Sequence, residues 1–252
     1  MSGTVYLVGA GPGAPDLLTL RAARLLEAAD IVFHDALVHP GTLALAAGAE
    51  KIAVGKRCGK HLTVQKFINK RLVDAAQKHT IVIRLKGGDP MLFGRAQEEI
   101  DALVTAGVAF EVVPGITAAL AASAQIGTSL TRRGLSRNVA FVTPRVGDAE
   151  RAGDWAASAL AADTAAIYMG AGQAHMISAT LVARGLSGAT PVAILENVSL
   201  PAFAARYGTL ATLPALAAQT GDGPALILLG EVLRERLLQQ SASAGGRRRA
   251  SA

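Results

Sequence analysis

The first half of the chain alternates short apolar runs with longer stretches of helical periodicity. The apolar runs, typical of buried strands, cover residues 4–8, 31–33, 51–54, 80–85 and 110–113. Residues 64–78 and 96–106 instead place apolar side chains on one face of a helix. This alternation predicts an α/β fold with a parallel sheet of five strands, complete by about Ile126.

The second half repeats the alternation, with one difference near its end. Further strands are expected at residues 138–142, 165–169, 192–195 and 225–229, and helices at 155–162 and 173–183. Residues 203–209 are an additional candidate strand, whose short connections favour antiparallel pairing. We therefore predict two α/β domains, the first with a parallel sheet and the second with a mixed sheet, and an active site in the cleft between them.

Changes in composition along the chain predict the domain boundaries. Residues 1–126 are expected to form the N-terminal domain and residues 138–240 the C-terminal domain. The intervening segment 127–137 is rich in Gly, Ser and Arg and weak in periodicity, so it is predicted to be a linker. The basic segment 241–252 is predicted to be a disordered tail.

Composition narrows the class of protein. Hydrophobic residues make up 51% of the chain, enough for a sizeable core. No uncharged apolar run reaches the roughly 18 residues of a transmembrane helix, and the N-terminus begins with a strand pattern rather than a secretory signal. The single cysteine, Cys58, excludes an internal disulfide and suits a reducing compartment, so a cytoplasmic protein is expected.

The net charge of +6 is concentrated partly in the tail, which holds Arg247, Arg248 and Arg249. Without these three the net charge is about +3, an ordinary value for a globular protein. This weakens the alternative of a nucleic-acid-binding module built on the tail. A basic cleft for a polyanionic small molecule stays open, because the clustering of charges matters more than their sum.

A turn of unusual composition follows the strand at 80–85. Gly87 and Gly88 allow positive φ and close approach of backbone to a ligand, and Pro90 biases Asp89 away from the helical region. Ligands of open α/β sheets bind at the carboxyl ends of the strands. We therefore interpret this turn as the floor of a small-molecule site.

The segment GAGPGA, residues 9–14, resembles a dinucleotide-binding turn. It fits G-x-G-x-x-A, and Asp35 lies about twenty residues further on, where a ribose-binding acid is found. Pro12, however, has no N–H to offer a phosphate. A dinucleotide-dependent oxidoreductase stays open as an alternative. Asp16 is a candidate N-cap for the helix that follows.

Cations gather in three further segments. Lys56, Arg57, Lys60 and His61 lie in the loop after the third strand, which is either a solvated loop or an anion-binding lip. Arg95 stands at a helix start, where a cation opposes the helix dipole, so a functional role is favoured. Glu98 and Glu99 follow it, and first-turn glutamates simply complement the dipole.

The third segment is the predicted linker, with Arg132, Arg133 and Arg137. These arginines serve solubility alone, or face the ligand if the linker covers the cleft. The histidines show no metal-ligand spacing, and no metal site is expected.

Four motifs together resemble one family. VYLVGAGPGAPDLLTL, VGKRCGKH, VIRLKGGDPMLFGR and VVPGITAA are similar, in order, to the signatures of uroporphyrinogen-III C-methyltransferases, which are tetrapyrrole methylases. The resemblance extends from about Thr4 to Arg236. It implies a homodimer that uses S-adenosyl-L-methionine (SAM) and releases S-adenosyl-L-homocysteine (SAH).

The resemblance also implies site residues. The SAM contacts of the family fall on Pro12, Gly87, Gly88, Asp89, Leu92, Thr117, Ala118, Met169, Val198 and Ala225. Its proton acceptor matches Asp35 and its proton donor Lys56. Its charged residues on the substrate side match Arg95, Glu98 and Arg133.

The implied substrate is uroporphyrinogen III, a macrocycle with many carboxylates, methylated at C-2 and C-7 through precorrin-1 to precorrin-2. The product would feed sirohaem, cobalamin or haem d1 synthesis. Some positions depart from the family pattern: His34 replaces Tyr, Ala96 and Gln97 replace a pair of glycines, Ser129 replaces Pro, and residues 143–145 replace Thr-Gly-His. These departures concern the placement of the substrate and not the SAM site. A later precorrin methyltransferase, the nearest rival within the superfamily, is kept as an alternative.

Overall fold

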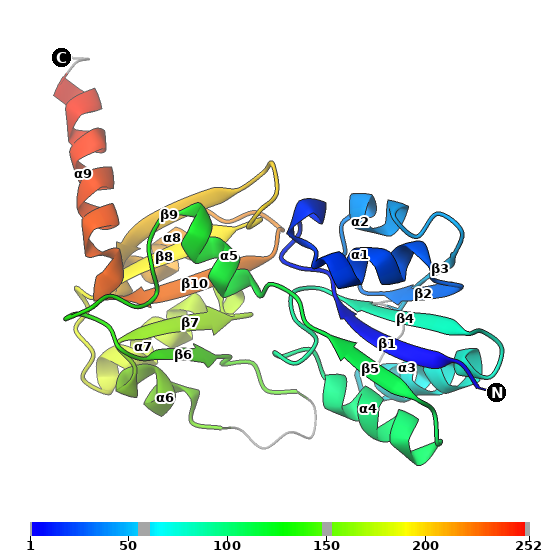
Figure 1. The fold of residues 1–252 in the computed structure, drawn as a ribbon. Helices are drawn as coiled ribbons and strands as arrows, with labels where there is room; N and C mark the ends of the chain where they lie inside the picture. The colour runs from blue at the N-terminus through cyan, green and yellow to red at the C-terminus, as the bar shows by residue number, and fades with distance from the viewer. Residues whose placement is uncertain (1, 55–60, 148–152, 250–252) are drawn as a thin grey trace. The chain divides into compact units, whose positions relative to one another are not determined.

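The computed structural model describes residues 2–54, 61–147 and 153–249 of the 252-residue chain (Figure 1). The chain divides into two compact units, Met1–Ala118 and Ala119–Ala252. Each unit is built on one sheet, and the described residues supply five strands to each. The predicted cleft between two domains stays a prediction.

The first unit has the predicted parallel sheet. Its strands lie in the order β3-β2-β4-β1-β5, and every neighbouring pair is parallel. The strands are β1 Thr4–Gly9, β2 Ile31–His34, β3 Glu50–Ala53, β4 Ile81–Lys86 and β5 Phe110–Val113. The helices are α1 Leu20–Glu27, α2 Pro40–Ala44, α3 His61–Ala76 and α4 Ala96–Thr105.

Both faces of this sheet are buried, because side chains of a strand point alternately to its two faces. Leu7 and Val82 pack with Leu72 of α3 and Leu103 of α4 on one face. On the other face, the core that includes Ile83 is shared with α1. The alternation means that Val82, Arg84 and Lys86 all point toward the α3–α4 face.

The second unit has the predicted mixed sheet, in the order β6-β7-β10-β8-β9. The β6–β7 pair is parallel, and the other pairs are antiparallel, including the additional strand β9 against β8. The strands are β6 Val139–Val142, β7 Thr164–Tyr168, β8 Pro191–Glu196, β9 Ala204–Thr209 and β10 Ala225–Gly230. The helices are α5 Ala118–Gln125, α6 Trp155–Ala161, α7 Ala174–Ala183, α8 Leu213–Ala217 and α9 Arg234–Arg249.

The boundary between the units lies eight residues before the predicted one, so α5 and the predicted linker 127–137 belong to the second unit. Hydrogen bonds explain this grouping. The backbone N–H of Ala119 donates to the Tyr168 hydroxyl (3.1 Å), and the Gln125 side chain accepts from the N–H of Ser199 (2.8 Å). The Ser136 hydroxyl, within the predicted linker, donates to the carbonyl of Leu130 (2.9 Å).

Two local predictions differ from the structure. Asp16 is not an N-cap: it lies inside a 3₁₀ turn, Pro15–Leu17, and α1 is capped by Thr19, whose hydroxyl accepts from the N–H of Ala22 (3.1 Å). The segment predicted as a disordered tail from Ser241 continues α9 to Arg249. Among the described helices, none has the length and apolarity to cross a membrane.

Candidate active site

Glycine-rich loops meet at the carboxyl ends of β1, β4 and β5. Gly11 and Gly88 exchange backbone hydrogen bonds, with N–O distances of 3.2 and 2.7 Å. Gly88 has a φ of +69°, in the left-handed region. A Cβ on Gly9 would lie 2.6 Å from the Cα of Gly115. The three loops therefore touch backbone to backbone, which only glycine permits at these positions.

Asp89 fastens two of these loops together. One carboxylate oxygen accepts from the N–H of Met91 (2.8 Å), and the other accepts from the N–H of Gly115 (2.9 Å). The side chain is half-buried. Asp89, predicted as a cofactor contact, thus holds the β4 loop against the β5 loop.

The predicted cofactor contacts of the first unit gather on these same loops. Thr117 is buried, and its Cα would lie 3.9 Å from a Cβ on Gly88. Gly87 is exposed, whereas Pro12 and Leu92 are half-buried. Apart from the Asp89 carboxylate, these residues present neutral side chains or bare backbone, which suits a cationic, partly apolar ligand.

The second unit brings two of its predicted contacts into one pocket. Met169 and Ala225 line a pocket of about 420 Å³, together with Arg145 and short loop residues. Met169 has a φ of +55°, so the chain turns sharply as it leaves β7. Val198 is buried and lies outside the lining of this pocket.

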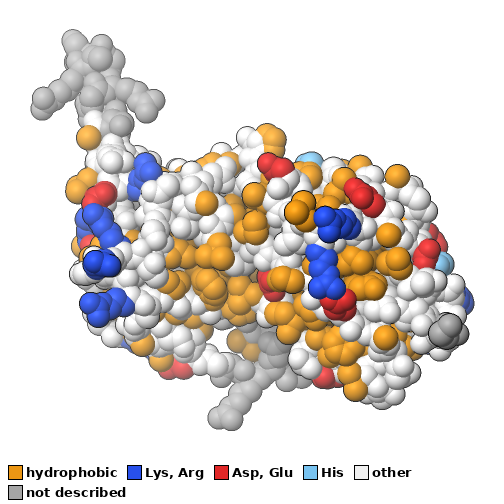
Figure 2. All heavy atoms as spheres, in the orientation of Figure 1, with side chains coloured by type: hydrophobic (Ala, Val, Ile, Leu, Met, Phe, Trp, Pro, Cys, Tyr) orange, Lys and Arg blue, Asp and Glu red, His pale blue; other side chains and the backbone are white. Residues whose placement is uncertain are grey.

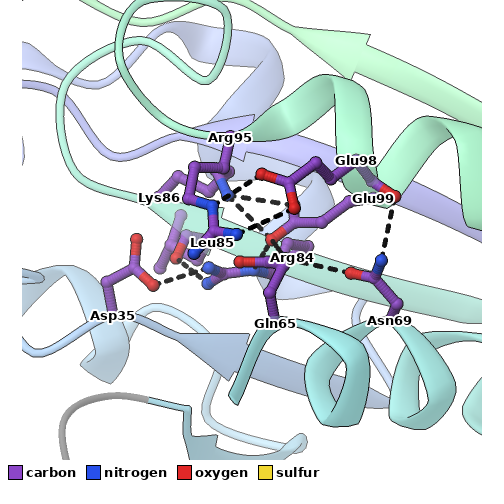
Figure 3. A network of polar contacts seen from close by, with 9 residues as sticks. All are labelled: Asp35, Gln65, Asn69, Arg84, Leu85, Lys86, Arg95, Glu98 and Glu99. Carbon is purple, nitrogen blue, oxygen red and sulfur yellow. Dashed lines mark hydrogen bonds and ion pairs between the residues drawn. The ribbon is translucent and has the colours of Figure 1, made fainter. Parts of the chain in front are cut away.

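Next to the glycine loops, the first unit buries a cluster of charged side chains, shown in Figure 3. Arg84 and Lys86 of β4 are only 3% and 2% exposed, and Glu99 of α4 is fully buried. Charged groups are almost never buried unless they are paired. Here each of these three side chains pairs with a group of opposite charge.

Arg84 lies between two carboxylates. Its Nη2 donates to Oδ1 of Asp35 (2.6 Å), and its Nε donates to Oε1 of Glu99 (3.0 Å). The Nζ of Lys86 reaches both oxygens of Glu99, at 2.9 and 3.0 Å. Gln65 of α3 adds a further hydrogen bond to Glu99 (3.2 Å). We call Asp35, Arg84, Lys86 and Glu99 the buried charge cluster.

Burial and charge move the pKa values of the two cations in opposite directions. Burial lowers the pKa of the Lys86 ammonium, and the positive charge of Arg84 lowers it further, against the opposing pull of Glu99. Burial also acts to lower the pKa of the Arg84 guanidinium, but Glu99 and Asp35 outweigh it and raise that pKa. Both carboxylates of the cluster therefore stabilise the charge on Arg84.

The predicted substrate-side residues are exposed, and two of them, Arg95 and Glu98, lie beside the buried charge cluster (Figure 3). Arg95 adopts left-handed backbone (φ 56°) at the start of α4 and forms a two-point ion pair with Glu98, at 2.6 and 2.8 Å. Arg133 is exposed in the second unit, where its neighbour Arg132 pairs with Glu235 (2.7 Å). The predicted proton donor Lys56 and the cations Arg57 and Lys60 lie outside the described residues.

The interpretation of Glu99 as a helix-dipole complement was incomplete, and Arg84 and Lys86 were missed. The sequence did carry a signal for them. β4 is a central strand with both faces covered, yet it places cations at two alternate positions, 84 and 86, which share one face. Buried cations on that face require a carboxylate from the covering helices, and α4 supplies Glu99.

Comparison with known proteins settles the family. The family model of tetrapyrrole (corrin/porphyrin) methylases matches residues 4–214. This chain belongs to the tetrapyrrole methylase family. The resemblance of its motifs to that family is thereby confirmed.

Among curated relatives, the siroheme synthases of Thiobacillus denitrificans and Sodalis glossinidius are each 46% identical to this methylase. The matches cover 97% and 92% of this chain but 52% and 49% of those proteins. The chain thus spans about half the length of the curated relatives it matches.

Among solved structures, uroporphyrin-III C-methyl transferase from Thermus thermophilus, complexed with S-adenyl homocysteine, is 40% identical, with a TM-score of 0.80. The match covers 92% of this chain and 99% of that one. A cobalt precorrin-4 methyltransferase is 28% identical with the same TM-score, over 91% of this chain and 95% of that one. The two-sheet α/β fold of this methylase is therefore the fold of the family.

Proposed function

We propose that this tetrapyrrole methylase transfers methyl groups from SAM to uroporphyrinogen III. The observation that carries the proposal is the similarity, over 92% of this chain, to the uroporphyrin-III enzyme solved with S-adenyl homocysteine, at 40% identity. The finer steps, methylation at C-2 and C-7 through precorrin-1 to precorrin-2 and supply of sirohaem, cobalamin or haem d1 synthesis, belong to the same proposal.

The residues of the glycine loops fit SAM. When bound, SAM supplies an electrophilic methyl group on a sulfonium cation. Gly87 and Gly88 offer bare backbone, and Thr117 and Leu92 offer neutral side chains. No cation is found among the ten predicted contacts, which avoids repulsion of the sulfonium. In the second unit, Met169 and Ala225 line a pocket with room for part of such a ligand.

In this proposal a carbon of the macrocycle attacks the methyl carbon, the sulfur–methyl bond breaks, and SAH leaves with the bonding electrons. A proton must then leave the macrocycle. Asp35 is proposed to accept it, and Lys56 to act as proton donor. In-line alignment can supply roughly 7–11 kcal/mol of the barrier reduction, and a positioned acid or base adds about a hundred- to ten-thousandfold.

Guanidinium groups suit the carboxylates of uroporphyrinogen III, because they bind carboxylates through two parallel hydrogen bonds. Arg95 already holds Glu98 in this geometry on the exposed start of α4. We propose that Arg95 and Glu98, together with Arg133, contact the substrate. Exchange of the Glu98 carboxylate for a substrate carboxylate would conserve the pairing of Arg95.

We expect Arg95→Ala and Arg133→Ala to raise the KM for uroporphyrinogen III at least tenfold, since each removes a charge-assisted pair worth about 1.5–3 kcal/mol. SAH affinity, measured by calorimetry, should stay within about twofold of wild type. Arg184→Ala is the matched control, because Arg184 is an exposed arginine that pairs with Asp154, the N-cap of α6. Equal losses of SAH and tetrapyrrole binding would show that these arginines have been assigned to the wrong ligand.

The alternatives predict different ligands. A later precorrin methyltransferase would bind SAH but leave uroporphyrinogen III unmethylated. A dinucleotide-dependent oxidoreductase would bind NADH at the turn of residues 9–14, and Pro12 and the family membership both disfavour it. Calorimetry with SAH and NADH separates this last alternative from the other two.

We also propose a homodimer and a cytoplasmic location. Figure 2 shows hydrophobic side chains gathered on the surface of the second unit, over α5 and the β6–β7 side of its sheet. Leu120 of α5 is 54% exposed and Phe141 of the edge strand β6 is 37% exposed. Large exposed apolar patches mark protein interaction sites. Sedimentation of the wild type and of Leu120→Glu tests this, and an unchanged monomer in both would contradict it.

A further inference from the structure

We propose that Arg84 is a positioning residue, held by Glu99, that orients the carboxylate of Asp35 for proton transfer. The inference rests on the proposed function, in which Asp35 accepts the proton. It assigns a role in the reaction to a side chain that is almost completely buried and does not itself reach a ligand surface.

The sheet register brings Arg84 and Asp35 together. Arg84 lies opposite Phe33 in the β2–β4 pairing, and Asp35 follows two residues later on β2's carboxyl side. The backbone N–H of Asp35 donates to the carbonyl of Leu85 (3.3 Å), while its Oδ1 accepts from Arg84 (2.6 Å). Successive residues of β4 therefore hold both the backbone and the side chain of Asp35.

The guanidinium is itself fixed at three points. Nη2 donates to Asp35, Nε donates to Glu99 (3.0 Å), and Nη1 donates to the carbonyl of Leu85 (3.2 Å). A guanidinium is planar and its donors form a rigid fork, so three contacts determine its orientation. Figure 3 shows Arg84 between Asp35 on one side and Glu99 on the other.

Glu99 fixes the position of the Arg84 guanidinium, because it is fully buried and accepts hydrogen bonds from Arg84, Lys86 and Gln65. Lys86 also pairs with Glu99, so Arg84 shares that carboxylate and uses its Nη2 for Asp35. A cation buried in this way stabilises one position of its carboxylate partner.

The Asp35 carboxylate has the geometry of a proton acceptor whose orientation is fixed by a hydrogen bond. One oxygen, Oδ1, is bound to Arg84, and the other, Oδ2, accepts no hydrogen bond from the part of the chain that the structure describes. The side chain is 33% exposed, whereas that of Arg84 is 3% exposed. One oxygen is thus fixed by Arg84, while the side chain as a whole stays one-third exposed.

A double-mutant cycle with the full chain tests the inference. Arg84→Met should lower kcat for uroporphyrinogen III methylation about a hundredfold, the effect of misplacing a reacting group by roughly 1 Å. The KM and the SAH affinity should stay near wild type. Asp35→Asn should also lower kcat, and adding Arg84→Met to Asp35→Asn should lower it no further. Multiplied effects in the double variant would overturn the proposal, because Arg84 would then act without Asp35.

Arg84→Lys keeps the charge of the cluster and gives a second test that does not depend on tolerance of Met. A lysine has a single donor nitrogen, which cannot take the positions of the three guanidinium nitrogens that contact Asp35, Glu99 and Leu85, so kcat should again fall at least tenfold while SAH still binds. A wild-type kcat in Arg84→Lys would show that charge alone matters and would overturn the orienting role.

Failure of the proposed function would look different. If the wild type methylated no uroporphyrinogen III, or if Asp35→Asn kept the wild-type rate, the assignment of the reaction or of its base would fail, and this inference with it. If the wild type methylates uroporphyrinogen III and Asp35→Asn lowers the rate, but the effects of the two substitutions multiply in the double variant, only the role of Arg84 is contradicted.

Discussion

At the residue scale, the close approach of three loops in the first unit depends on the absence of side chains. Gly9 ends β1 and lies against the backbone of Gly115, which follows β5. A Cβ on Gly9 would also lie 2.8 Å from the carbonyl oxygen of Gly88. All the atoms involved are backbone, so they cannot move aside as a flexible side chain would.

Gly9→Ala should therefore destabilise the protein by about 1–3 kcal/mol, the usual cost of overpacking, and should weaken SAH binding. Gly48→Ala is the matched control, because a Cβ there would meet nothing within 4 Å. The control should stay within about 0.5 kcal/mol of wild type. Urea unfolding and calorimetry measure the two effects, and equal stability of both variants would contradict the packing described here.

Lys86 gives the stability a dependence on pH. Its pKa in the folded state is lowered from 10.5 by burial and by Arg84, so between the lowered value and 10.5 the unfolded chain binds more protons. The contribution of Lys86 to the free energy of unfolding is therefore complete above pH 10.5 and is lost as the pH falls through the lowered pKa.

Urea midpoints of wild type and Lys86→Met, compared from about pH 7 to pH 10.5, test this prediction. The stability of the wild type relative to the variant should rise with pH between the lowered pKa of Lys86 and 10.5. A constant difference, or one that falls, would show that the Lys86 pKa is not lowered in the folded state.

At the element scale, the helix after the first glycine loop begins three residues later than Asp16 suggested. Thr19 caps it, with its hydroxyl 3.1 Å from the N–H of Ala22. Thr19→Ala should cost about 1 kcal/mol of stability, because the cap hydrogen bond is lost. Thr19→Ser keeps the hydroxyl and should stay close to wild type in the same thermal unfolding experiment. Similar losses in both variants would argue against a capping role.

Periodicity predicted the strands and most helices, since strands such as 80–85 and helices such as 96–106 differ clearly in apolar spacing. It could not assign α5 to a unit. That helix consists mainly of alanine, so it has no apolar stripe, and its hydrogen bonds to Tyr168 and Ser199 reveal its partner.

The candidate site was predictable in part for a similar reason. Glycine and proline determine which backbone conformations a loop can adopt, so residues such as Gly88 and Asp89 could be found from the sequence. The buried charge cluster could not be read as directly. It joins Asp35, Arg84 and Glu99, which are far apart in sequence and meet only through the sheet register and the packing of α4.

At the scale of the whole molecule, the parallel topology of the first unit explains where its functional residues lie. Strands β1, β2, β4 and β5 all run in one direction, so their carboxyl ends share one edge of the sheet. The glycine loops and Asp35 follow those ends. The second unit adds its own pocket beside Met169 and Ala225, where β7 ends and β10 begins.

The most direct test of the central claim is the product formed by the purified chain with SAM and freshly generated uroporphyrinogen III. Mass spectrometry should detect a tetrapyrrole that has gained two methyl groups, with two SAH released for each product. A chain that binds SAH but leaves the tetrapyrrole mass unchanged would contradict the claim.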